Sequence, residues 1–277
     1  MNIEKCSIED IYEYTDLQKN DTILYLGGRI DDDNLYPVEY SKYLNSQIKE
    51  LSPDKIICHN YWYAKQYYDK GILSDDTKID IVLSYYGYFE EGPRNSINPE
   101  KYNNYKNWIK ILIDKNPNIV YALYIDDNKN FNNRPSSIYV NDDLFGENYD
   151  LNNIKYFERD RRLMFKVPQE EEKKLNGTGG FVTLIKMLES GFNNLHILGF
   201  SAFGSDEDQS NFSKYGVNCI NTKFHRHYNR YYKNKTYFDL KSSEDQKAEA
   251  HILQYLCNDN VLTNLENYSK LKESREQ

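Results

Sequence analysis

Residues 175–203, LNGTGGFVTLIKMLESGFNNLHILGFSAF, decide the fold of this chain. The stretch opens with a polar, glycine-dense turn at 176–180, and an amphipathic run over 181–188 then predicts a helix. Gly191 stands where a helix C-cap glycine belongs, and the apolar run at 195–200 predicts a buried strand. The unit is therefore a glycine turn, a helix, a capping glycine and a strand.

Alternating strands and helices extend upstream of this unit. Short apolar runs predict buried strands at 22–26, 55–58, 79–84 and 118–125. Periodic apolar residues predict helices at 8–14, 37–51, 61–69 and 98–112. This alternation predicts an α/β fold: a Rossmann-like, mainly parallel sheet with helices on both faces. A short strand at 163–167 and an amphipathic helix at 243–257 complete the expected elements, and the charged tail after them is expected to fray.

The composition indicates a folded, soluble protein. The 277 residues are 39% hydrophobic and 15% aromatic, which excludes a disordered chain. The net charge of −8 argues against general nucleic-acid binding, which needs a basic excess. The four cysteines form no C-x-x-C pair, so reduced thiols are expected rather than a zinc site or a disulfide framework.

No apolar run reaches the length of a signal peptide core or of a membrane span. We therefore expect a cytoplasmic protein without a membrane span. No linker rich in proline, glycine or serine divides the chain, so a single domain over 1–277 is expected. The oligomeric state stays open.

The exits of the predicted strands point to one ligand-binding edge. In parallel sheets ligands bind outside the carboxyl ends of the strands, and glycine turns before helices bind phosphates through free N–H groups and the helix dipole. Residues of these types at these places are Gly27, Gly28, Asn60, Thr178, Gly179 and Gly180. Each also has a structural interpretation: tight turns for the glycines and Asn60, and a side-chain helix cap for Thr178.

Two of these segments resemble sialyltransferases. Residues 178–203 resemble the central motif of the bacterial family, a [TS]-x-G turn, a helix and a strand without gaps, and the eukaryotic family has a related stretch ending in a "yGF" strand. Residues 54–63, DKIICHNYWY, resemble the family strand whose asparagine binds the donor nucleotide, and Asn60 takes that place. His227 followed by tyrosine, and Glu249 further on, resemble the lid of the eukaryotic family.

The resemblance implies a sialyltransferase-like variant of the GT-A fold, with a lid at about 204–240. It implies a glycosyltransferase that moves a sugar from a nucleotide-sugar donor, CMP-sialic acid, to a hydroxyl of a glycan acceptor. No cofactor and no metal are implied beyond this donor. The glycines, Asn60 and Thr178 named above would bind the donor nucleotide.

The chain departs from the family at several positions. Arg29, Tyr85, Ser201 and Phe203 replace residues usual in the family, and its general-base histidine aligns with Leu240 or Glu244. These departures favour an alternative, a non-catalytic nucleotide- or glycan-binding relative.

The general base, if the chain is an enzyme, must come from another residue. His227 is the first candidate because imidazole titrates near neutrality. His225 and Glu244 are held in reserve, the glutamate needing a pKa raised by burial, and His59 is a further candidate.

Other chemistry has weaker support in the sequence. Acidic clusters at 31–33 and 126–127 resemble metal-binding D-x-D sites, but solvated acidic loops are the more common explanation of such clusters. An unrelated nucleotide-dependent enzyme on the same sheet is a third interpretation, because a fold alone does not define a function.

Overall fold

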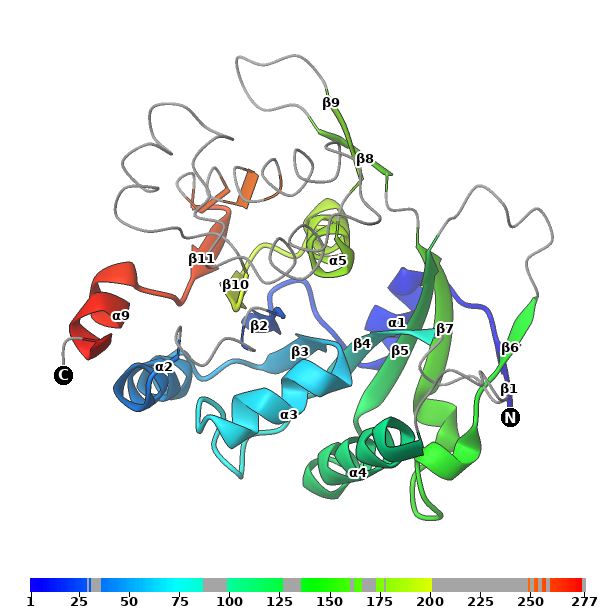
Figure 1. The fold of residues 1–277 in the computed structure, drawn as a ribbon. Helices are drawn as coiled ribbons and strands as arrows, with labels where there is room; N and C mark the ends of the chain where they lie inside the picture. The colour runs from blue at the N-terminus through cyan, green and yellow to red at the C-terminus, as the bar shows by residue number, and fades with distance from the viewer. Residues whose placement is uncertain are drawn as a thin grey trace, which may run out of the picture.

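A seven-stranded, entirely parallel sheet forms the centre of the molecule (Figure 1). The computed structural model describes residues 1–28, 30, 36–86, 99–126, 136–159, 162–165, 173–176, 178–200, 249, 252–253, 256–257 and 260–275. The strand order is β11-β10-β2-β3-β4-β5-β7. The strands are β2 (Ile23–Leu26), β3 (Lys55–His59), β4 (Ile81–Tyr85), β5 (Val120–Asp126), β7 (Ile154–Arg159), β10 (Leu195–Leu198) and β11 (Leu262–Asn264).

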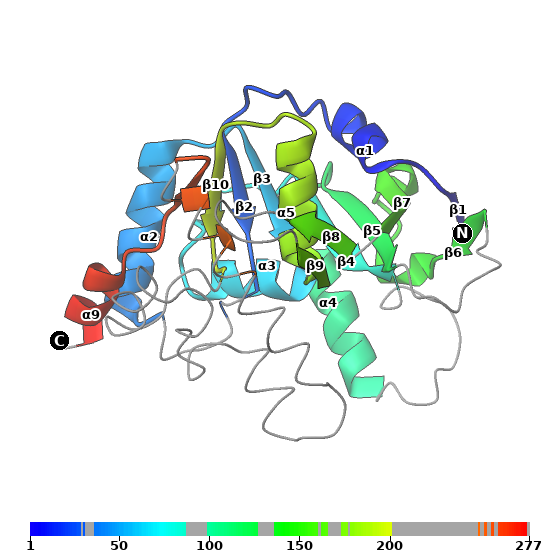
Figure 2. The same cartoon turned by 90° about the horizontal axis from the view of Figure 1, so that it is seen from above.

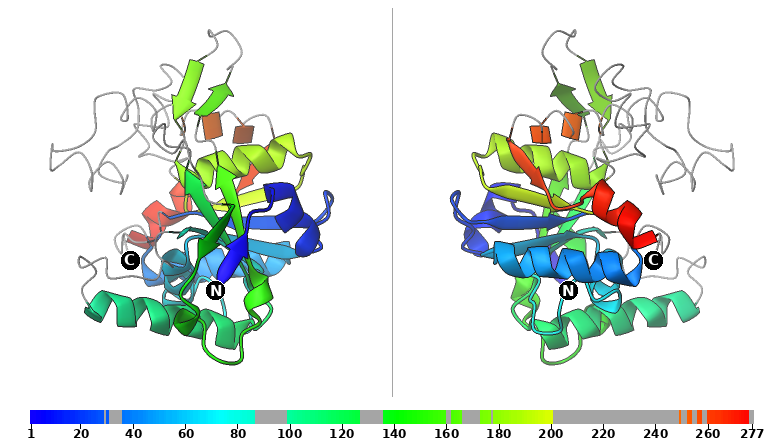
Figure 3. Two further views of the ribbon diagram at one scale, coloured as in Figure 1. Left: turned by 90° about the vertical axis from the view of Figure 1, so that its right-hand side faces the viewer. Right: turned by 90° about the vertical axis from the view of Figure 1, so that its left-hand side faces the viewer.

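Helices cover both faces of this sheet, which gives three layers (Figure 3). One face packs against α2 (Val38–Leu51), α3 (Tyr61–Asp69), α4 (Pro99–Lys115) and α9 (Tyr268–Arg275). The other face packs against α1 (Ile8–Tyr14) and α5 (Gly179–Glu189), and Figure 2 shows α5 lying over the sheet. Among the described residues, no helix is both long enough and apolar enough to span a membrane.

The strands are apolar at successive positions because both faces of the sheet are buried. In β2, Leu24 and Leu26 pack into the core beneath α2 and α3, whereas Ile23 and Tyr25 pack into the core beneath α5. All four residues are fully buried. A strand that alternates between two cores has no polar face, which is the pattern that predicted β2 from the sequence.

Short elements lie at the periphery. Strands β1 (Asn2–Glu4) and β6 (Ser137–Tyr139) form one antiparallel pair, and β8 (Arg162–Phe165) and β9 (Lys173–Asn176) form another. The 3-10 turns η3 (Asp142–Leu144) and η4 (Leu151–Asn153) precede β7. Strand β8 overlaps the strand predicted at 163–167.

The structure confirms the α/β fold class and the main elements, and it corrects the sequence analysis in two regions. The sequence predicts no element between the strands at 118–125 and 163–167, but the structure has β6 and β7 there, the latter an edge strand of the main sheet. The tail expected to fray instead contributes β11 and α9. Most of the helix expected at 243–257 lies outside the described residues, although residues 249, 252–253 and 256–257 are helical.

Candidate functional site

The carboxyl ends of all seven strands lie at one edge of the sheet, as expected. From β2 the chain builds outward through β3, β4, β5 and β7, and then α5 carries it back across the sheet to β10 on the other side of β2. The strand order therefore reverses between β2 and β10. This switch point is where sheets of this type bind ligands.

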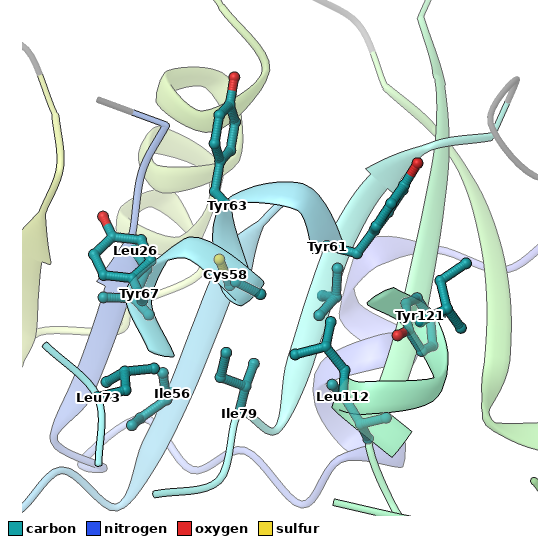
Figure 4. Close-up of a cluster of buried hydrophobic side chains, with 14 of the residues drawn as sticks. Leu26, Ile56, Cys58, Tyr61, Tyr63, Tyr67, Leu73, Ile79, Leu112 and Tyr121 are labelled. Carbon is teal, nitrogen blue, oxygen red and sulfur yellow. The ribbon is translucent and has the colours of Figure 1, made fainter. Parts of the chain in front are cut away.

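Tyr67 of α3 fills the base of the switch point. Its hydroxyl lies 3.0 Å from the carbonyl oxygen of Gly27 and 3.1 Å from that of Leu198, and so joins the ends of β2 and β10. Figure 4 shows Tyr67 beside Leu26, with Tyr63 one turn earlier on α3. A Cβ on Gly199, which has a φ of +76°, would lie 2.0 Å from this hydroxyl. The switch point thus requires glycine at 199.

Gly27 and Gly28, two of the four glycines predicted to bind the donor, have clear packing roles. A Cβ on Gly27 would lie 2.4 Å from the carbonyl oxygen of Gly199, and a Cβ on Gly28 would lie 2.6 Å from the ring of Tyr63. The backbone of Gly199 lies too close to Gly27, and the ring of Tyr63 too close to Gly28, for either position to carry a side chain. This close packing explains why both residues at the exit of β2 are glycine. Whether they also contact a ligand stays a prediction.

Asn60 closes the turn between β3 and α3. It adopts a φ of +77°, and its side-chain oxygen accepts a hydrogen bond of 3.2 Å from the backbone N–H of Trp62. Its own N–H donates to the carbonyl of Leu83 at 2.7 Å. Asparagine suits this place because it tolerates positive φ and caps helices well. The structural interpretation of Asn60 is confirmed, and its donor-binding role stays a prediction.

Thr178 precedes α5 but does not cap the helix with its side chain. Its carbonyl accepts the first helical bond, from Val182 N–H at 2.9 Å. Its backbone N–H and its hydroxyl both donate to the carboxylate of Glu249, the hydroxyl at 2.9 Å. Glu249 is buried, with 7% of its surface exposed. An internal carboxylate therefore lies at the turn where the sequence predicted an external phosphate.

The turn before α5 comes close to the exits of β3 and β10. A Cβ on Gly180 would lie 3.5 Å from the ring of Phe200 and 3.6 Å from that of His59. A Cβ on Gly179 would clash with His59 and Arg159, 2.7 Å from each. Three chain segments predicted separately to contribute to the site therefore meet at the first turn of α5.

Arg159, at the end of β7, is the residue that the sequence analysis missed. It is 5% exposed, and its Nη1 donates to the carbonyl oxygen of Gly179 at 2.7 Å. Its guanidinium lies 3.7 Å from the ring centre of Tyr124, whose ring stacks against His59. Arg159 lies in a run of charged residues at 158–162, which is more typical of a solvated loop than of a buried site. The residues before it, at 154–157, could have predicted a strand that ends near Arg159.

The arginine carries positive charge into a buried, aromatic environment. Burial raises the pKa of the Tyr25 hydroxyl well above its usual range, and nearby Arg159 and Thr183 oppose this rise. Thr183 also donates to the Gly179 carbonyl, at 3.0 Å. The first turn of α5 is thus flanked by a fixed cation, a histidine and a buried carboxylate.

Several predicted residues lie outside the described part of the chain. These are His225, His227 and Glu244, the lid expected at about 204–240, and the acidic residues at 31–33. Within the described residues, no cluster of three histidine, cysteine or acidic side chains could hold a metal ion.

The parallel sheet, the two helical layers and the glycine turn at the carboxyl edge define an α/β protein of Rossmann-like architecture. A scan against models of protein families and a search of curated proteins find no match to this chain.

Proposed function

We propose that the protein is a glycosyltransferase that uses a nucleotide-activated sugar, with CMP-sialic acid as donor and a glycan hydroxyl as acceptor. The observation that carries this proposal is the meeting of Gly179 and Gly180 with His59 and Phe200 at the carboxyl edge of the sheet. The order of elements supports it, because the glycine turn, helix and strand that resemble the sialyltransferase motif are contiguous here as α5 and β10. The donor sugar is taken from that resemblance.

The chemistry needs stabilisation of a departing phosphate. As the acceptor oxygen bonds to the anomeric carbon, the bond from that carbon to the phosphate oxygen breaks and CMP leaves with the electron pair. Backbone N–H groups at the start of α5 and the positive end of its dipole suit this charge. Arg159 adds a fixed positive charge one hydrogen bond away from Gly179.

A base must accept the proton of the acceptor hydroxyl. His227 keeps this role in the proposal, with His225 and Glu244 in reserve. Among the described residues His59 is a further candidate, since its ring adjoins Gly179 and Gly180 and its Nε2 lies 3.4 Å from the Tyr124 hydroxyl. Alanine at the true base is expected to lower kcat roughly a hundredfold or more.

Calorimetric titration with CMP tests the binding site. Thr178→Trp places a large side chain at the start of α5 and is expected to abolish CMP binding. Ser190→Trp, at the other end of the same helix, is the matched control and is expected to bind CMP like the parent protein. Equal affinity for CMP in both variants would contradict the assignment of Thr178 and the start of α5 to the nucleotide site.

The Glu249 contacts favour a second candidate, a non-catalytic nucleotide- or glycan-binding relative. The carboxylate engages both donors of Thr178, the residue expected to help bind the phosphate. CMP binding without hydrolysis of CMP-sialic acid, and without transfer to any glycan acceptor, would support this candidate. Slow hydrolysis in the absence of acceptor would support the enzyme.

A further inference from the structure

A cleft of about 650 Å³ lies beside the first turns of α5. It belongs to the face of the sheet that carries α1 and α5, and Figure 3 shows these two helices on one side of the sheet. Its walls come from the segment 5–10 before and within α1, from 157–159 at the end of β7, and from Thr183 and Lys186 of α5. The cleft could not be anticipated from the sequence, since the segment 5–10 is more than 100 residues away from the other two walls.

The lining of the cleft is amphipathic, and its charged side chains are balanced in sign. Three cationic and three acidic side chains line it, together with two hydroxyls, and apolar atoms make up the larger share of its surface. The cations are Lys5, Arg159 and Lys186; the acids are Glu9, Asp10 and Glu158; the hydroxyls are Ser7 and Thr183; the apolar surface is Ile8 and Phe157.

This balance of donors and acceptors selects among ligand classes. A small anion would meet three carboxylates, and an apolar molecule would strip water from charged groups without replacing their hydrogen bonds. A polyhydroxylated molecule avoids both costs, because each hydroxyl can donate to a carboxylate and accept from an ammonium or guanidinium group. Phe157 and Ile8 offer apolar surface to its C–H groups.

We propose that this cleft binds a neutral sugar. The position of the cleft beside α5 relates it to the proposed reaction. Arg159 and Thr183 line the cleft and also donate to the Gly179 carbonyl, at 2.7 and 3.0 Å. The cleft therefore borders the turn assigned to the donor phosphate. We assign the cleft as the subsite for the sugar acceptor. This assignment rests on the proposed function, whereas the binding of a sugar does not.

Cys6 supplies an internal reporter of occupancy. Cys6 lines the cleft and is only partly buried, and its thiol donates to the carbonyl of Tyr156 at 3.2 Å. Burial, followed by the charge of Asp10, raises the pKa of this thiol, so it alkylates slowly at neutral pH and its rate is easily followed at mildly alkaline pH. A sugar seated in the cleft will cover the thiol and slow alkylation further.

The experiment measures the rate of Cys6 alkylation by iodoacetamide, by mass spectrometry of the peptide that contains it. Galactose, glucose, N-acetylglucosamine and lactose are titrated separately into the protein without nucleotide. Saturable protection of Cys6 by at least one sugar is the expected result. Inorganic phosphate serves as an anionic probe and is expected not to protect.

A pair of variants locates the binding. Lys186 and Glu189 form an exposed ion pair of 2.5 Å on α5, but only Lys186 lines the cleft. Lys186→Ala and Glu189→Ala lose the same ion pair, so any shared effect on the helix cancels. Lys186→Ala is expected to weaken the protecting sugar about fivefold through loss of a charged hydrogen bond, and Glu189→Ala is expected to leave it unchanged.

Lack of protection by every sugar at concentrations up to about 100 mM, where even a ligand of millimolar Kd saturates its site, would overturn the proposal. Protection by phosphate alone, or equal weakening in both variants, would overturn it as well. The CMP titration distinguishes failure of this proposal from failure of the proposed function. Protection by a sugar without CMP binding would contradict the glycosyltransferase and support the sugar-binding cleft. CMP binding without protection would support the nucleotide site and contradict the sugar-binding cleft.

Discussion

Glu249 accepts two hydrogen bonds from Thr178, one from the backbone N–H and one, of 2.9 Å, from the hydroxyl. The two residues are 71 positions apart in the chain, and the contact fastens the C-terminal part of the protein to the start of α5. A carboxylate at this place also complements the positive end of the helix dipole.

Loss of the Glu249 side chain is expected to destabilise the fold. Glu249→Ala removes two hydrogen bonds to a charged group and should lower the free energy of unfolding by about 2 kcal/mol. Urea unfolding of Glu249→Ala, of Thr178→Val and of the double variant forms a cycle. The two changes should be markedly non-additive, because each removes the hydroxyl–carboxylate bond; additive effects would show that this bond contributes nothing to stability.

The effects of substitutions at Gly199 and Tyr67 on stability should also be non-additive, because the two residues touch at the switch point. Gly199→Ala adds a methyl group 2.0 Å from the Tyr67 hydroxyl at a residue with positive φ, so a loss of about 3 kcal/mol or more is expected from clash and backbone strain together. Adding Tyr67→Phe relieves the clash but not the strain. Denaturant midpoints should therefore recover in part, and the absence of any recovery would contradict the predicted clash.

Arg159 and Lys155, both on β7, allow a buried cation–π contact to be compared with a more exposed one. Arg159 lies over Tyr124 and is 5% exposed, whereas Lys155 lies over Tyr14 and is only partly buried. Arg159→Met should cost about 2–4 kcal/mol, since the Gly179 bond is lost as well, and Lys155→Met should cost less than about 1 kcal/mol. Similar losses in thermal or denaturant unfolding would show that burial adds nothing to the arginine contact.

The stability of the protein should fall in mild acid through His196. Burial lowers the pKa of this imidazole on β10, so the unfolded chain takes up a proton near pH 6.5 while the folded state still resists it. Stability contributed by the neutral ring is complete above pH 7 and declines as pH falls toward the lowered pKa. His196→Gln should flatten the difference in unfolding free energy between pH 7 and pH 5; an unchanged slope would assign that dependence to other groups.

The sequence was informative wherever the chain repeats one physical pattern over several residues. β2 and β3 are buried on both faces, and their uninterrupted apolar runs revealed them. Gly191, with a φ of +91°, follows the end of α5, as its place in the sequence predicted. Such features depend on neighbours in the chain and can be read from one segment at a time.

Features that depend on distant partners were not visible in the sequence. β7 mixes charged and aromatic residues, and β11 has only three residues whose role depends on pairing with β10. The Tyr67 hydroxyl and the Leu198 carbonyl are 131 positions apart, so nothing in either segment predicts their contact. Arg159 belongs to the same class, because its importance comes from a turn 20 residues away.

Strand β11 also constrains when the protein can fold during its synthesis. β10 pairs with β2 on one side and with β11 on the other, and Glu266 just beyond β11 accepts a buried hydrogen bond of 2.7 Å from Tyr36. These contacts join residues near positions 23–36 to residues made more than 200 positions later. The ribosome must therefore release the chain at least through β11 before the sheet is complete, and until then β10 presents an unpaired edge that a chaperone or a neighbouring nascent chain can bind.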